Sequence, residues 1–351
     1  MRKIIKLFLV SLFFIFSQNA LAKKNIIVLA TGGTIAGVGA SESEASYSAG
    51  KISIQDLLSK IPSLSKLANL KGEQLMQISS ENMNDETWIL IAKKVDELVR
   101  DSSVDGIVIT HGTDTIEETA YFLDLTINTK KPIVLVGAMR PATSMSADGA
   151  LNLHNAVAVA ADKNSVNKGV LVVFNDLIFD ARSVTKTHTS NVAAFQSPNF
   201  GPLGIVSYGD VKFYYEALRA HTNNSEFNIK KIKALPKVDI LYGYAGFDDE
   251  LVNNLVENGA KGIVFAGAGD GNIYKNALEK LINLSKEEKL LVARSSRVGA
   301  GYIIRGAEIN DDENGFINAD NLNPQKARIL LKLALTKSDN WADVQKIFNK
   351  Y

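Results

Sequence analysis

The strongest constraint on the fold is the alternation of short, β-rich apolar runs with helical segments along most of the chain. The runs that read as buried strands are residues 25–30, 106–110, 133–136, 169–174, 238–242, 262–265 and 290–293. Between the first two, apolar side chains from Trp88 to Leu98 recur at helical spacing behind Asn84, a good helix N-cap. Buried strands alternating with amphipathic helices predict an α/β fold, with a mainly parallel sheet covered on both faces.

The pattern is interrupted once by a polar stretch, which suggests two domains. Residues 221–226 have no periodic apolar face, and Pro236 follows them. We therefore predict a larger N-terminal domain over 23–212, a linker over 213–235 and a smaller C-terminal α/β domain over 236–351. In the last part of the chain, Asn323 followed by Pro324 predicts the start of a helix.

The first 22 residues have the three parts of a secretory signal peptide. Three basic residues precede an almost unbroken apolar run from Leu7 to Phe16, and Ala20-Leu21-Ala22 supplies small residues for cleavage. The alternative, a membrane anchor, needs a run of ~20 residues. We expect cleavage after Ala22 and a periplasmic mature protein that has no membrane attachment.

The composition excludes several classes of site and partner. The chain has no cysteine, which rules out disulfides, thiolate chemistry and lipid attachment through cysteine. Its four histidines are scattered, so we expect neither a metal nor another cofactor. Removal of the three basic signal residues lowers the net charge from +1 to −2, which indicates no nucleic-acid partner.

One long segment breaks the alternation of strands and helices. Residues 31–52 are rich in Gly, Ser, Thr and Ala and contain little that is apolar. They follow the first predicted strand, and ligands of open parallel sheets bind beyond the carboxyl ends of the strands. We predict a functional loop that covers such a site.

The first candidate cluster, Thr31-Gly32-Gly33-Thr34, opens this segment. Two glycines permit a tight turn, and Thr34 adds a hydroxyl. An ordinary turn explains the residues equally well at this stage. A phosphate-binding loop does not, because Val38 and Gly39 stand where Lys and Ser or Thr are required.

The second cluster, Thr110 to Thr115, follows another predicted strand. His111 is a candidate base, but a histidine hydrogen-bonded within the turn is favoured because no partner is evident. Asp114 is a candidate ligand or a cap for the following helix.

Two further segments are uninformative alone. Ser80 and Glu81 suit a polar loop before a helix, and Lys186 suits a solvated lysine. Residues 267–272 approach a dinucleotide motif, but Asn272 replaces its third glycine, so we interpret them as a backbone turn that displays Asp270 and Asn272.

Together these clusters resemble the bacterial L-asparaginases, in particular the periplasmic type II enzymes. ATGGTIAG (30–37) and THGTDTIEETAYFLDL (110–125) are similar to the two signature segments of that family. The resemblance extends to GEQLMQISSENMND (72–85), VGAMRPATSMSADG (136–149), VTKT, SSRV and LNPQKAR. It implies a larger flavodoxin-like domain and a homotetramer of two intimate dimers. It also implies hydrolysis of linear amide bonds without a cofactor, with L-asparagine as substrate and weaker glutaminase activity.

The resemblance also assigns roles at matching positions. As catalytic residues it implies Thr34, Tyr47, Thr113, Asp114, Lys186 and Glu308. As substrate-binding residues it implies Gly33, Ser80, Glu81, Thr113, Asp114, Asn272 and Glu308. Asn272 and Glu308 correspond to positions that reach the site from a neighbouring subunit.

These residue types suit amide hydrolysis, which needs a nucleophile, proton transfers and donors for the developing oxyanion. Thr34 is the expected nucleophile, with Tyr47 and Glu308 as its proton relay. Thr113 and Lys186 are expected to act on the water, although the residues leave open which threonine attacks first. Glu81 departs from many relatives, which have glutamine there.

A protein of another class remains an alternative. An exported chain with two α/β domains and an amino-acid-shaped site also suits a periplasmic amino-acid-binding protein without catalysis. Hydroxyls beside a lysine and a loop tyrosine favour the enzyme, and ammonia release from asparagine distinguishes the two.

Overall fold

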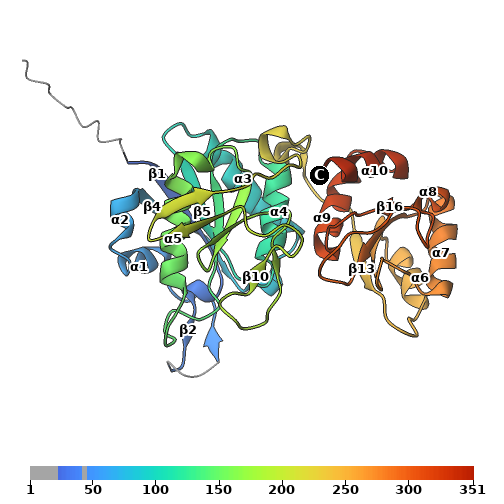
Figure 1. Cartoon of the computed structure of the whole chain (residues 1–351), viewed down its shortest axis with the longest axis horizontal. Helices are drawn as coiled ribbons and strands as arrows, with labels where there is room; N and C mark the ends of the chain where they lie inside the picture. The colour runs from blue at the N-terminus through green and yellow to red at the C-terminus, as the bar shows by residue number, and fades with distance from the viewer. Residues whose placement is uncertain (1–22, 42–45) are drawn as a thin grey trace, which may run out of the picture.

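The computed structural model describes residues 23–41 and 46–351. The predicted signal peptide therefore lies outside the described residues, as does the short part 42–45 of the segment after the first strand. Within the described residues no helix combines the length and the apolar character needed to cross a bilayer. Two α/β units follow each other along the chain (Figure 1).

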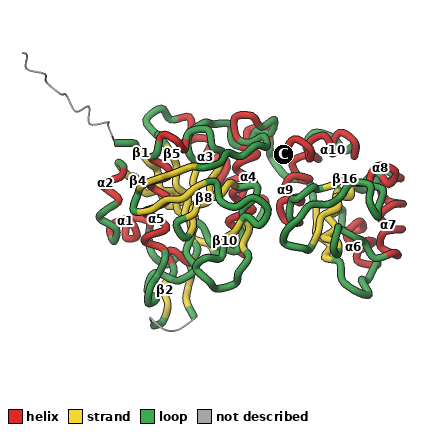
Figure 2. Tube along the Cα trace, in the orientation of Figure 1, coloured by secondary structure: helices red, strands yellow, loops and turns green. Residues whose placement is uncertain are grey.

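An eight-stranded sheet forms the centre of the N-terminal unit, with helices packed on both sides of it (Figure 2). In spatial order its strands are β12 (Asp210–Phe213), β11 (Gly204–Ser207), β8 (Leu177–Asp180), β7 (Val170–Phe174), β6 (Ile133–Val136), β5 (Gly106–Thr110), β1 (Asn25–Gly32) and β4 (Asn69–Ile78). The five strands from β7 to β4 are parallel, which confirms the predicted fold class.

Successive side chains of these strands enter opposite apolar layers, as the pleat of a strand requires. Ile27 and Leu29 of β1 join the layer under α3 (Asp85–Arg100) and α4 (Ile116–Thr126). Ile26 and Val28 join the other layer, under α1 (Ile54–Ser59), α2 (Leu64–Leu67) and α5 (Gly149–Ala161). A sheet buried on both faces explains why its strands read as continuous apolar runs.

The sheet differs from the sequence prediction at both edges. Strand β4 was not predicted, because it is an edge strand in which exposed and half-buried residues alternate, with Glu73 and Gln74 at its centre. At the other edge β8, β11 and β12 run antiparallel to their neighbours. Their four-residue length gives too little periodicity to detect from sequence.

The C-terminal unit has a four-stranded parallel sheet in the order β13 (Val238–Tyr242), β14 (Gly262–Gly267), β15 (Leu291–Ser296) and β16 (Ile317–Asn318). One apolar layer contains residues of α6 (Glu250–Glu257) and α7 (Lys275–Lys286), together with Ile309 and Phe316 on either side of α8 (Asp311–Asn314). The opposite face is covered by α9 (Pro324–Ala334) and α10 (Trp341–Lys350). As predicted, the Asn323 side chain caps α9, by accepting a hydrogen bond from the Lys326 backbone. The segment between the two sheets, from Phe213 to Val238, contains only η4 (Thr222–Asn224) and η5 (Ile229–Lys231).

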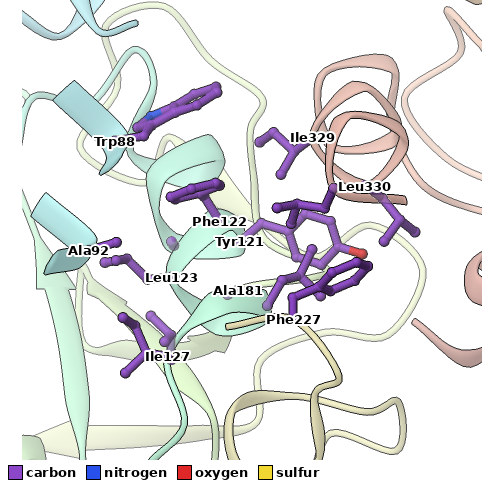
Figure 3. Close-up of a cluster of buried hydrophobic side chains, with 14 of the residues drawn as sticks. Trp88, Ala92, Tyr121, Phe122, Leu123, Ile127, Ala181, Phe227, Ile329 and Leu330 are labelled. Atoms are coloured by element: carbon purple, nitrogen blue, oxygen red, sulfur yellow. The ribbon is translucent and has the colours of Figure 1, made fainter. Parts of the chain in front are cut away.

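The two units share one hydrophobic core. Helix α4 packs against α9, and one continuous buried cluster contains residues of both sheets. Figure 3 shows Tyr121 and Phe122 of α4 facing Ile329 and Leu330 of α9, with Phe227 beside them. The domains are therefore joined by apolar packing, and the connecting segment itself contributes Phe227 to it.

The described parts of segment 31–52, residues 31–41 and 46–52, contain more regular structure than the predicted loop. Strand β1 continues to Gly32, and Thr34–Ala36 form a 3-10 turn, η1. Two short strands, β2 (Val38–Gly39) and β3 (Tyr47–Ser48), then pair as an antiparallel hairpin. The Thr143 hydroxyl accepts a hydrogen bond from the Gly39 backbone at 2.8 Å, which ties the hairpin to the loop after β6.

Candidate functional site

The candidate site lies at the carboxyl ends of three neighbouring strands, β4, β1 and β5. Register pairs Gly32 with Ile78 and Ala30 with Thr110, so these strands end at the same edge. The chain passes from β1 to β4 on one side and then to β5 on the other. The reversal of strand order between β1 and β5 is the place where open α/β sheets bind ligands.

Two glycines bring the two threonine loops together. Gly33 has φ +84°, and a Cβ added there would lie 2.4 Å from the backbone nitrogen of Gly112. Gly112 packs in turn against the Ser80 hydroxyl, 2.5 Å from where its own Cβ would be. Thr34 and Thr113 each follow one of these glycines. Gly112 was not singled out from sequence, although 110–113 repeats the Thr-X-Gly-Thr pattern of 31–34.

Thr34 is paired with the tyrosine of the hairpin. It is buried in η1, and its Oγ1 lies 2.7 Å from the hydroxyl of Tyr47 on β3. Tyr47 is 44% exposed, so the hairpin side of the site faces solvent. The pairing gives the Thr34 hydroxyl a direct partner for proton exchange.

Thr113 is paired with a lysine that is distant in sequence. Lys186 lies on β9 (Thr185–Lys186) and donates to Thr113 Oγ1 at 2.9 Å and to Asp114 Oδ1 at 2.6 Å. The Lys186 side chain is 17% exposed and that of Asp114 is 59% exposed. The ammonium is thus oriented by the threonine and the carboxylate together.

Ser80 joins the ends of β4 and β5. Its buried hydroxyl accepts a hydrogen bond from the Asp114 backbone at 3.2 Å, and its carbonyl accepts one from the Thr115 hydroxyl at 2.8 Å. Asp114 therefore does not cap α4: the N-cap position belongs to Thr115, and the Asp114 carboxylate contacts Lys186 instead. The adjacent Glu81 is exposed and accepts a 2.5 Å hydrogen bond from the Ser79 hydroxyl.

Both ring nitrogens of His111 are hydrogen-bonded within the protein, as the sequence favoured. Burial lowers the pKa of His111 to about 4, against the opposing effect of its bond to the Gly112 carbonyl. The neutral ring therefore donates from Nδ1 to that carbonyl at 2.7 Å, and Nε2 accepts from Thr119 at 2.9 Å. This histidine braces the loop before Thr113 and is not available as a base.

Asn272 and Glu308 lie on the C-terminal unit. Asn272 is in the turn after β14, where it forms a bridge with Ala268, so residues 267–272 are a backbone turn as predicted. Glu308 is exposed in the segment before α8. Within the described chain, neither side chain forms a hydrogen bond or ion pair with the residues around Thr34 and Thr113.

The assembled groups are suited to acyl transfer. Two hydroxyls lie on loops in contact, one beside a phenol and the other beside an ammonium, which is the arrangement of an activated nucleophile with proton-transfer partners. In the described part of the chain, no three His, Asp or Glu side chains are grouped closely enough to hold a metal.

Comparison with known proteins agrees with this geometry. Residues 25–219 match the family described as Asparaginase, N-terminal, and residues 237–348 match the Glutaminase/Asparaginase C-terminal domain. The chain is 50% identical to L-asparaginase 2 of Escherichia coli strain K12 over 96% of both chains. It is 49% identical to a Haemophilus influenzae protein named "Probable L-asparaginase periplasmic", over 95% of both.

A solved structure is equally similar. The crystal structure titled as a probable cytoplasmic L-asparaginase from Campylobacter jejuni superposes with a TM-score of 0.91 at 50% sequence identity. The alignment covers 94% of this chain and all of that one. With both halves matched and relatives at half identity along nearly the whole length, the chain belongs to the asparaginase family.

Proposed function

We propose that the mature chain hydrolyses the side-chain amide of L-asparagine to L-aspartate and ammonia, and acts more weakly on L-glutamine. The observation that carries this proposal is the pair of activated hydroxyls at one sheet edge, Thr34 with Tyr47 and Thr113 with Lys186 and Asp114. The names of the relatives and the glutaminase/asparaginase family of the C-terminal half support the choice of substrates.

In the first step the Thr34 hydroxyl attacks the amide carbon. The C–O bond forms, the C–N bond breaks, and the hydroxyl proton passes through the Tyr47 phenol to the leaving nitrogen, so that ammonia departs. The 2.7 Å Thr34–Tyr47 contact supports this path. A positioned proton donor of this kind contributes a rate factor of ~10²–10⁴.

In the second step water cleaves the aspartyl ester on Thr34. Thr113 orients the water, and Lys186 polarises it through its 2.9 Å bond to Thr113. The water oxygen bonds to the ester carbon, the bond between that carbon and the Thr34 oxygen breaks, one water proton passes to the Thr34 oxygen, and L-aspartate leaves.

The charges around the site suit a zwitterionic substrate. The carboxylates of Asp114 and Glu81 face the substrate ammonium, and the Ser80 hydroxyl with Gly33 and neighbouring backbone N–H groups receives the substrate carboxylate.

Asn272 and Glu308 complete the site from a neighbouring subunit of a homotetramer. Exposed side chains that line one hollow of the single chain, Phe200, Tyr215 and Leu218, support self-association. Light scattering of the purified protein measures the assembly.

Export to the periplasm is part of the proposal. It is supported by the signal-like residues 1–22 and by the similarity to the Haemophilus protein named as periplasmic. N-terminal sequencing of the protein from a periplasmic extract tests it, with Lys23 as the expected first residue.

The decisive experiment combines turnover with binding. Mature protein is incubated with asparagine, and ammonia is measured; Thr34→Ala is expected to lose nearly all turnover while still binding substrate by calorimetry. Binding without ammonia release by the unaltered chain would instead identify an amino-acid-binding protein. Retained turnover in Thr34→Ala would transfer the nucleophile's role to Thr113.

A further inference from the structure

A buried lysine of the C-terminal unit reaches into the N-terminal unit close to the proposed catalytic lysine. Lys326, in the first turn of α9, is only 1% exposed. Its ammonium donates to the backbone carbonyl of Arg182 at 2.9 Å and to that of Val184, and it lies 3.7 Å from the Glu117 carboxylate. Val184 is two residues before Lys186.

The groups around Lys326 belong to the two segments that carry the Thr113–Lys186 pair. Glu117 is the second residue of α4, directly after the loop of Thr113 and Asp114, and it accepts a 2.8 Å bond from Gln325. Asn323 bridges both segments: its amide donates to Glu117 at 3.2 Å and to the Thr185 hydroxyl at 3.3 Å. The start of α9 thus holds α4 and β9 together.

Strand β9 belongs to a small sheet, apart from the eight-stranded one. It is two residues long, and its strand partner among the described residues is the two-residue strand β10 (Phe195–Gln196). Hydrogen bonds from a buried ammonium to two carbonyls just before Lys186 therefore constrain where its side chain begins.

The buried Lys326 ammonium is not explained by a gain in folding stability alone. Burial lowers the pKa of Lys326, and Glu117 opposes that shift. Replacing buried ionic groups by apolar side chains is often neutral or stabilising, whereas a buried network specifies one geometry when its members are satisfied.

We propose that Lys326, supported by Glu117, is a positioning residue that holds β9 so that Lys186 reaches Thr113 and Asp114. The proposal rests on the proposed function, because Lys186 matters only if the chain hydrolyses amides. It predicts that Lys326 affects turnover through Lys186 and by no other route.

The test is a double-mutant cycle on ammonia release. Lys326→Met is expected to lower kcat by about 10- to 100-fold with little change in KM, the effect of a displacement near 1 Å. In a Lys186→Met background it is expected to lower kcat no further, because the residue it positions is absent. Circular dichroism and thermal unfolding confirm that each variant is folded.

Lys332→Met is the matched control. Lys332 lies on the same helix, is 2% exposed, and also joins the two units, but its ammonium bonds to Asp85 and to the Pro236 carbonyl, away from α4 and β9. It is expected to lose stability and retain kcat within about twofold. Glu117→Gln is the second variant if Lys326→Met does not fold, with a smaller kcat loss that again disappears in the Lys186→Met background.

Each of the following results would contradict one of the proposals in a distinguishable way. Equal kcat losses from Lys326→Met in both backgrounds would overturn the positioning role, as would a similar loss in Lys332→Met. For Glu117→Gln the same loss in both backgrounds would also overturn it. Absence of ammonia from the unaltered chain would overturn the proposed function, and the positioning role with it.

Discussion

The close contact between Gly33 and Gly112 provides a test of whether turnover requires the two threonine loops to lie so near each other. Gly33 has φ +84° and ψ 179°, a conformation that is essentially reserved for glycine. In Gly33→Ala the new Cβ would lie 2.4 Å from the Gly112 nitrogen, whereas ordinary contact begins at 3.4 Å. The neighbours of this Cβ are backbone atoms, which cannot rotate away as a side chain could. The two loops therefore have to separate by about 1 Å.

This displacement sets the expected size of the effect. A misplacement of ~1 Å between reacting groups lowers turnover by ~100-fold, equivalent to ~2.7 kcal/mol of transition-state stabilisation. The strained backbone adds ~1–3 kcal/mol of lost folding stability. Both quantities are measurable, the first by ammonia release at saturating asparagine and the second by urea denaturation.

Gly246→Ala separates the two effects. Gly246 also has a positive φ, +74°, but a Cβ there would have no neighbour within 4 Å. It is expected to lose stability and keep full turnover. The reasoning is wrong if Gly33→Ala retains wild-type kcat, or if Gly246→Ala loses as much activity as Gly33→Ala.

Two further predictions concern carboxylates. Glu81→Gln is expected to raise the kcat/KM of glutamine relative to asparagine by up to about 10-fold, because the longer substrate places its ammonium less well against an acceptor-only carboxylate. Exposed Glu86→Gln is the control, and an unchanged ratio in Glu81→Gln would dismiss the idea. Glu118→Gln addresses pH: burial and then the neighbouring Glu117 raise the pKa of Glu118 from 4.5 to about 7. Because the pKa of Glu118 is raised in the folded state, its protonated carboxyl contributes fully to the free energy of unfolding below pH 4.5. This contribution, ~3 kcal/mol in all, is lost as the pH rises through 7. Urea midpoints at fixed protein concentration should therefore favour the Gln variant more at pH 8 than at pH 4.5, and parallel pH profiles for the two proteins would speak against this assignment.

The sequence predicts those strands best that are buried on both faces. Residues 106–110 and 133–136 match β5 and β6 because their side chains enter apolar layers on both sides, which leaves a continuous apolar run. Edge strand β4 carries polar residues at its centre, so it lacks the continuous apolar run by which a strand can be predicted.

The site was only partly predictable for a related reason. Thr34 and Thr113 stand out because they lie in the segments that follow predicted strands, whereas Lys186 lies on a two-residue strand with no periodic pattern and was assigned by resemblance alone. Lys326 and Glu117 are distant in the sequence and meet because the two domains pack together. Their contact could therefore not be predicted from the sequence. Its one local signal is a lysine on the otherwise apolar face of a helix.

The core shared by the two units limits how a substrate can enter. A two-domain receptor admits its ligand by rotating the domains apart about a hinge. Here such a rotation would expose Leu330 and Phe227 to water, at ~25 cal/mol for each Å², and would withdraw Lys326 from the carbonyls it binds. Shared apolar packing therefore holds the two domains together, and we expect substrate to enter and leave on the solvent-facing side of the site, where Tyr47 is 44% exposed.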